Sequence, residues 1–399
     1  MTAWQDDAAR DLMSLGGRLA LLERGNGSAV WDTDGNRYLD FLGGIAVNSL
    51  GHAHPAFVAA VSQQAAVLTH VSNYFATPQQ LTFAATLKRL AGTGESGRVF
   101  FANSGTEANE TAVKLARLHG GKTGKRTIIS LNHAFHGRSV GALSLTPKPI
   151  YQDPFRPLLP DVIHIDNTIE ALEAAIDDTV AAIFIEPIQG EAGVVEHPEG
   201  FLRRARELTT EHNALLIVDE VQTGMGRTGE WFAFQHEGIV PDAVTLAKGI
   251  AAGFPLGAMI TFGAASDLFY PGTHNSTFGG NPLGTAVGQA VVDTIESDAL
   301  LANVTARGAQ LRAAVEALPG VTGTSGKGLL IGIHLAEPVA AQLREAAQRH
   351  GLIINAPTDD VIRIAPAYTI GDAEVEEFTR QFAAALADVS TPTAEEARA

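Results

Sequence analysis

Short apolar runs alternate with amphipathic stretches between residues 98 and 262 of this 399-residue chain. The intervening stretches, such as 107–118 and 202–212, carry apolar residues at helical spacing. Short runs that are apolar throughout are typical of strands buried on both faces. The alternation therefore predicts βαβ units, and with them an α/β domain in which helices sandwich a mostly parallel sheet. The predicted strands cover residues 99–101, 127–129, 181–185, 215–218, 243–246 and 258–261.

The pattern changes after Pro282, where this regular alternation stops. A long helical region is followed by a strand, a helix and a second strand, expected over 283–317, 329–334, 339–350 and 361–365. This order predicts a smaller α+β domain, which the strand-like stretches 29–31 and 38–40 should join. The chain is long enough for two domains. We expect an N-terminal segment joining the small domain, a large cofactor-binding domain and a C-terminal small domain, with bounds 1–55, 56–285 and 286–399.

Composition excludes several classes of function. The chain has 28 Lys and Arg against 44 Asp and Glu, a net charge of −16, which argues against nucleic acid and anionic membranes as partners. It has no cysteine, which excludes disulfides, thiol catalysis and cysteine-bound metals. His52 and His54 have no third ligand at a recognisable spacing, so no metal site is expected. Residues 1–10 do not resemble a signal peptide, so a soluble cytoplasmic protein is expected.

A lysine and an aspartate each stand at the end of a predicted strand. Lys248 closes the apolar run 243–247, and Asp219 follows the run 215–218. Either residue alone is more often a solvated cap or a turn residue. Together they point to the edge of an open α/β sheet where ligands bind. Among common cofactors, pyridoxal phosphate needs both groups, an amine to form a Schiff base and an acid to keep its pyridinium nitrogen protonated.

A candidate phosphate site follows the first predicted strand. Ser104, Gly105 and Thr106 open the helical stretch 107–118. Free backbone amides at a helix start, two hydroxyls and a glycine that permits close approach suit a phosphate group. An ordinary helix N-cap is an equally good reading of these residues alone. A phosphate-bearing cofactor would explain both this site and the Asp219/Lys248 pair.

Three more side chains are candidates for ligand contacts. Phe135 and Arg138 follow the strand predicted at 127–129, and could stack on a flat heterocycle and grip a carboxylate. A core phenylalanine and a surface arginine are the ordinary alternatives. Arg363 interrupts the apolar strand at 361–365, and a buried arginine needs an anionic partner.

Two stretches of the sequence have the glycine spacing G-x-G-x-x-G of the dinucleotide-binding fingerprint. The pattern at 92–97 precedes its strand and follows a helix, which is the reverse of the required order. The pattern at 224–229 is separated from its strand by the five residues 219–223. A nicotinamide-dependent dehydrogenase is therefore only a minor alternative.

With these residues assembled, the chain resembles the class-III aminotransferases of the pyridoxal phosphate fold-type I group, over about residues 25–367. The resemblance implies that Lys248 binds the cofactor covalently and moves a proton between substrate and cofactor. It also implies that Asp219 pairs with the pyridine nitrogen and that Gln222 lies near the phenolic oxygen.

The remaining cofactor contacts also follow from the resemblance. Gly105 and Thr106, next to Ser104, match the phosphate site, and Phe135 matches the stacking ring. Thr277 matches a threonine that reaches the phosphate of the neighbouring subunit. The resemblance therefore implies a homodimer with shared active sites.

At the positions expected to contact the substrate, the chain resembles one branch of the family, the acetylornithine aminotransferases. Ile45 stands where ornithine aminotransferases carry a tyrosine that contacts the free α-amino group, and an apolar residue suits an acylated nitrogen better. Arg138 matches the residue that grips the substrate α-carboxylate, with Ser276 nearby. Arg363 and Glu191 match a pair that is proposed to act as a switch. The Glu191 side chain would hold Arg363 while the first amino donor reacts, and would release it to bind the α-carboxylate of the substrate glutamate.

The implied reaction transfers the terminal amino group of N2-acetylornithine to 2-oxoglutarate, giving N-acetylglutamate 5-semialdehyde and glutamate in arginine biosynthesis. Succinyldiaminopimelate is a second implied substrate. The alternatives are an ornithine or 4-aminobutyrate aminotransferase, a fold-type I mutase, or the dehydrogenase considered above.

Overall fold

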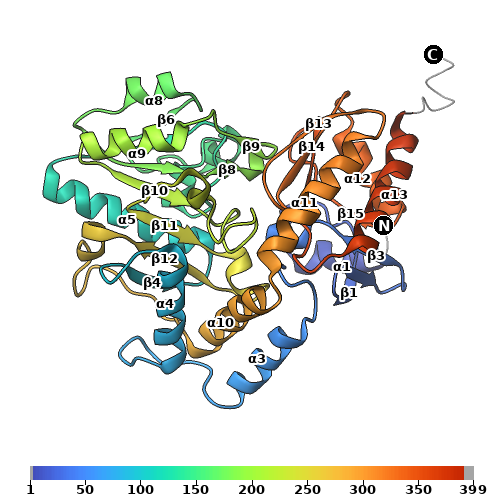
Figure 1. The fold of residues 1–399 in the computed structure, drawn as a ribbon, viewed down its shortest axis with the longest axis horizontal. Coiled ribbons are helices and arrows are strands. Elements are labelled where there is room, and N and C mark those ends of the chain that lie inside the picture. Colours follow the sequence, from blue (N-terminus) through green and yellow to red (C-terminus); the bar gives the residue numbers. More distant parts are fainter. Residues whose placement is uncertain (1–2, 391–399) are drawn as a thin grey trace.

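A central sheet organises the larger part of the computed structural model, which describes residues 3–390 (Figure 1). Within these residues the sheet has seven strands in the order β4-β12-β11-β10-β7-β5-β6, with bounds β4 (Arg98–Ala102), β12 (Gly257–Thr261), β11 (Ala243–Leu246), β10 (Leu215–Asp219), β7 (Val180–Ile185), β5 (Thr127–Leu131) and β6 (Val162–Ile165). β12 is antiparallel to both neighbours and the other pairs are parallel, so the prediction of a mostly parallel sheet is confirmed. β6, a partly exposed edge strand, was not predicted, although three of its four residues are apolar.

Helices cover both faces of this sheet. They are α4 (Pro78–Ala91), α5 (Gly105–Thr123), α8 (Ile169–Ala175), α9 (Phe201–Glu211) and α10 (Pro282–Ser297). Along β10, Ile217 packs in the apolar cluster that includes α5, while Leu216 and Val218 pack in the cluster that includes α4, α9 and α10. Successive strand side chains point to opposite faces. Burial on both faces explains why the strands read as continuous apolar runs.

Two smaller sheets, within the described residues, build the other part of the molecule. One has three antiparallel strands, β13 (Val321–Ser325), β14 (Ile331–Leu335) and β16 (Val361–Ile364), and the other has the order β1 (Leu22–Asn26), β2 (Ala29–Asp32), β3 (Arg37–Asp40) and β15 (Leu352–Ile353). The helices here are α11 (Leu300–Glu316), α12 (Ala340–Arg349) and α13 (Asp372–Ser390). Leu352 of β15 pairs with Leu39 of β3, so N-terminal and C-terminal strands share one sheet.

α10 connects the two parts. Its Val287 and Val292 pack in the cluster of the seven-stranded sheet, whereas Val291 and Ile295 pack with the smaller sheets. The long helix expected over 283–317 is broken, because Ala299 between α10 and α11 is left-handed, with φ of 52°. The domain bounds at residues 55 and 285 stay predictions.

The remaining helices and strands are short: α1 (Ala3–Asp11), α2 (Gly43–Ala46), α3 (Pro55–Ala65), α6 (Val140–Ser144), α7 (Pro149–Gln152), β8 (Ile188–Gln189) and β9 (Val195–Glu196). Among residues 3–390, no helix has the length and apolar character needed to cross a membrane.

Candidate active site

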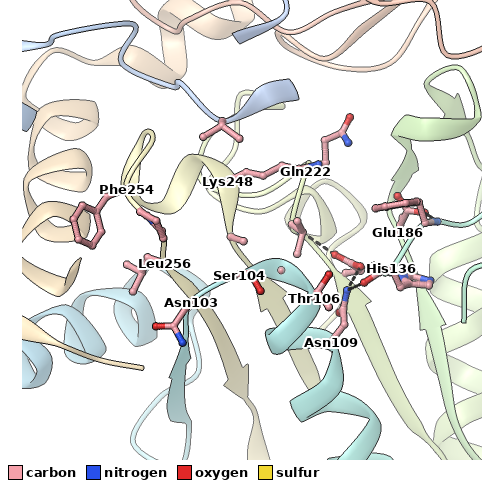
Figure 2. Close-up of a pocket in the computed structure, with 18 of the residues that line it drawn as sticks. Asn103, Ser104, Thr106, Asn109, His136, Glu186, Gln222, Lys248, Phe254 and Leu256 are labelled. Atoms are coloured by element: carbon pink, nitrogen blue, oxygen red, sulfur yellow. Dashed lines mark hydrogen bonds and ion pairs between the residues drawn. The ribbon is translucent and has the colours of Figure 1, made fainter. Parts of the chain in front are cut away.

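A cavity of about 300 Å³ lies beyond the carboxyl ends of the parallel strands. β4, β10 and β11 run in the same direction, so the residues that follow them meet at one edge of the sheet. Figure 2 shows the Lys248 side chain on one side of this space and Ser104 and Thr106 on the other. The predicted site residues that line the cavity are Ser104, Gly105, Thr106, Phe135, Asp219, Gln222 and Lys248.

The start of α5 borders the cavity. Ser104 is the N-cap of this helix, and its hydroxyl accepts a hydrogen bond from the Glu107 N–H at 3.2 Å. A Cβ added at Gly105 would lie 2.7 Å from a Val221 methyl carbon, so a larger residue would not fit without a shift. The Glu107 N–H is taken by this cap, whereas the Gly105 and Thr106 amides have no partner within the helix. Ser104 can therefore cap the helix while other amides of the helix start bind an anion.

Three donors hold the Asp219 carboxylate, which is only 4% exposed. Asn109 Nδ2 donates to it at 2.7 Å, His136 Nδ1 lies at 2.8 Å, and the Val221 N–H donates at 2.9 Å. Thr245 in turn donates to the Asn109 carbonyl oxygen at 2.7 Å, which fixes the orientation of that amide. The carboxylate is therefore held in one position beside the cavity.

Lys248 has an unusual backbone. Its φ of 49° lies in the left-handed region, which is strained for a residue other than glycine, and such strain often marks functional sites. Burial lowers the pKa of the Lys248 amine; the negative charge of Glu191 opposes this shift and the positive charge of Arg363 adds to it. A lowered pKa leaves a larger fraction of the amine neutral and nucleophilic.

Arg363 is 2% exposed and lies in a polar cluster at the edge of the site. Its Nη1 donates to Glu191 at 2.5 Å and to Gln222 Oε1 at 3.2 Å, and its Nη2 donates to Asn355 at 2.8 Å. Burial would raise the pKa of Glu191, but the charge and the hydrogen bond of Arg363 outweigh it and lower that pKa. Gln222 lines the cavity and is hydrogen-bonded to Arg363, so it links the Arg363–Glu191 ion pair to the cavity.

Other predicted residues lie outside the cavity lining. Arg138 is exposed, with its Cζ 3.5 Å from the centre of the Tyr151 ring and 5.7 Å from that of Phe135. Ser276 and Thr277 line a separate hollow, although Ser276 Oγ accepts a hydrogen bond from the cavity residue Asn103 at 3.4 Å. Within one chain, Thr277 therefore does not belong to the site that contains Lys248.

Asn109, His136 and Glu186 are among the cavity residues that were not predicted as site residues. Glu186 directly follows β7, as Asp219 ends β10, so the strand-end argument could have found it. Burial raises the pKa of Glu186 to about 7. Burial would lower the pKa of His136, but the hydrogen bond and charge of Asp219 outweigh it and raise that pKa. No sequence pattern marks Asn109, which lies inside α5.

Comparison with known proteins identifies the family. The sequence model described as aminotransferase class-III matches residues 14–386. The chain belongs to this family. An acetylornithine aminotransferase of Streptomyces coelicolor is 53% identical over 361 residues, covering 90% of this chain and 88% of that protein.

Solved structures of aminotransferases are similar to this chain. An ornithine aminotransferase of Toxoplasma gondii, described with pyridoxal phosphate at its active site, has a TM-score of 0.92 and 32% identity, covering 97% of this chain and 94% of that one. An N-acetylornithine aminotransferase of Stenotrophomonas maltophilia has a TM-score of 0.83 and 36% identity, covering 96% and 99%.

The expected fold and enzyme class are therefore confirmed. The chain has pyridoxal phosphate fold type I and is a pyridoxal phosphate-dependent aminotransferase. The dehydrogenase alternative is dropped. Its best glycine pattern lies in a loop after β10, where added Cβ atoms at Gly226 and Gly229 would meet Leu301 and Thr305 of α11. These glycines allow close packing between the two parts of the molecule.

Proposed function

We propose that this aminotransferase transfers the terminal amino group of N2-acetylornithine to 2-oxoglutarate in arginine biosynthesis, with glutamate and N-acetylglutamate 5-semialdehyde as products. The 53% identity to an acetylornithine aminotransferase carries this proposal. Ile45 supports it, since an apolar side chain suits an acylated nitrogen. Ile45 is 41% exposed and lies two residues from Val47, which lines the cavity. A cytoplasmic location is part of the proposal.

The donors around the cavity fit pyridoxal phosphate. The amides of Gly105 and Thr106 suit the phosphate, Asp219 suits the ring nitrogen and Lys248 suits the aldehyde. Phe135 borders the same space and offers a ring for stacking. When bound, this cofactor accepts an amino group and withdraws electrons from the adjacent carbon.

We assign the remaining steps to residues of this chain. The neutral Lys248 amine would take the proton from the substrate carbon that bears the amino group and deliver it to the cofactor carbon that receives this group, and it would move a proton in the reverse direction in the second half-reaction. Asp219 keeps the ring nitrogen positively charged, while Gln222 donates toward the phenolic oxygen. Arg138 binds a substrate carboxylate through its two parallel N–H groups.

Steady-state rates with three amino donors test the substrate assignment. Each of acetylornithine, ornithine and 4-aminobutyrate is paired with 2-oxoglutarate, and kcat/KM should be highest for acetylornithine. Succinyldiaminopimelate is a fourth donor that we expect to react. A higher kcat/KM for ornithine would overturn the assignment and favour the activity named for the Toxoplasma gondii structure.

The contact between Arg363 and Glu191 supports a switch between the two substrates. In this switch the α-carboxylate of the substrate glutamate replaces the Glu191 side chain as the partner of Arg363. Arg363→Lys should then slow the glutamate half-reaction about ten- to a hundredfold, because a point charge cannot bind a carboxylate bidentately. The acetylornithine half-reaction should change little. Single-turnover kinetics measure the rates of the two half-reactions separately. Arg312→Lys, a partly buried arginine bonded to backbone carbonyls elsewhere, is the control. Equal losses in both half-reactions would exclude the switch.

We also propose a homodimer in which Thr277 serves the phosphate of the other subunit. Exposed aromatic side chains around its hollow support an interface there: Tyr74 is 89% exposed, and Phe278, next in sequence to Thr277, is 58% exposed.

Subunit mixing tests this sharing. Lys248→Ala and Thr277→Glu chains should each be inactive, but a hybrid dimer should regain about half of the wild-type activity, because one of its two sites combines the intact residues. Activity is measured on purified hybrids that carry two different affinity tags. Hybrids without activity would refute the sharing of sites.

A further inference from the structure

Tyr151 of α7 lies next to two cations. The Arg138 Cζ is 3.5 Å from the centre of its ring, and the Lys148 Nζ is 4.9 Å from the same centre. An aromatic face attracts cations within about 6 Å. The ring therefore contacts the guanidinium that we assign to substrate carboxylates.

The carboxylate of Glu110, which contacts the residues that follow Arg138, is already occupied. Glu110 Oε1 accepts hydrogen bonds from the Ser139 hydroxyl and from the Gly141 and Ala142 N–H groups at 2.8 and 3.1 Å. Within residues 3–390, the Arg138 guanidinium has no ion pair or side-chain hydrogen bond. Its donors thus remain free for an anion from outside the chain.

The segment that carries the ring is anchored. The Gln152 side chain, next to Tyr151, is buried and donates to the Leu143 carbonyl of α6 at 3.0 Å. An exposed arginine loses side-chain entropy when a ligand orders it. If the Tyr151 ring already orders the Arg138 guanidinium before the ligand binds, less side-chain entropy is lost on binding.

We propose that Tyr151 is a positioning residue, which holds Arg138 ready to bind substrate carboxylates through the stacking of its ring. This inference rests on the role proposed above for Arg138. It predicts that removal of the ring weakens carboxylate binding more than it slows turnover, and that the hydroxyl group is not needed.

Glutarate, a five-carbon dicarboxylate without amino or keto group, is a suitable probe. Its dissociation constant is measured on the holoenzyme from the change in the visible spectrum. Tyr151→Leu should raise this constant, and the KM for 2-oxoglutarate, about two- to fivefold. kcat should change less, and Tyr151→Phe should behave like the wild type. Phe155→Leu, an exposed aromatic in the same segment, is the matched control.

A double-mutant cycle decides whether Tyr151 acts through Arg138. In an Arg138→Met background, Tyr151→Leu should cause no further weakening of glutarate binding. Additive losses, unchanged glutarate binding in Tyr151→Leu, or an equal loss in Tyr151→Phe would each overturn the inference. Because glutarate binding does not depend on the amino donor, an enzyme that prefers another donor would refute the proposed substrate and leave this test intact.

Discussion

Lys248→Ala should abolish turnover and the visible absorption band of the lysine-bound cofactor. The variant lacks the amine that binds the cofactor covalently and the group that moves the proton. We expect kcat to fall by at least about 10⁴-fold, the upper end of what a positioned acid–base group contributes. Absorption spectra of the purified protein and steady-state rates with acetylornithine measure the two effects.

Lys125→Ala is the matched control for this variant. Lys125 is also buried, at 9% exposure, but it donates to the Asp178 carbonyl at 2.9 Å and does not line the cavity. Its loss should lower stability without removing the visible band. A Lys248→Ala protein that kept its band and its turnover would show that another amine carries the cofactor.

Asp219→Asn should keep the visible band but slow proton removal from the substrate about 10²–10³-fold. A neutral amide can still accept the hydrogen bond from the Val221 N–H, but its NH2 group would face the Asn109 Nδ2 donor, so that contact is lost. The amide cannot balance the positive charge on the ring nitrogen, and such electrostatic stabilisation is worth this much in other active sites. Single-turnover rates of the acetylornithine half-reaction measure the loss.

Asp242→Asn provides the comparison. Asp242 precedes β11, at the end remote from Lys248, and accepts hydrogen bonds from the Leu216 N–H at 2.8 Å and from Arg206 at 2.7 Å. Its substitution removes a partly buried charge beside the same sheet without touching the cavity. Equal rates for Asp219→Asn and the wild type would argue against pairing of Asp219 with the ring nitrogen.

The strands that carry Asp219 and Lys248 leave a local pattern in the sequence. β10 and β11 are apolar on both faces, so their runs were visible in the sequence, and parallel pairing brings their carboxyl ends to one edge. Asp219 and Lys248 therefore line one cavity, as expected. Glu186 directly follows β7, so the same pattern marks it, although it was not among the predicted site residues.

Some features of the fold were not predicted from the sequence. β6 was missed, although three of its four residues are apolar. The break at Ala299 lies within a continuous helical pattern, because α10 packs against both parts of the molecule while α11 packs in the cluster of the smaller sheets. Helical periodicity reports that a face is buried, but not against which partner.

The sequence alone determined the α/β class, the strands that carry Asp219 and Lys248, and the helix start at Ser104, since each follows from the spacing of neighbouring residues. Only the tertiary structure decided which groups surround them. Asn109 and His136 contact Asp219 although they lie 110 and 83 residues away in the chain, and the stacking of Arg138 on Tyr151 depends on how the segment before α6 packs against α7. Such contacts have no period in the sequence, because they arise from the packing of whole helices and strands.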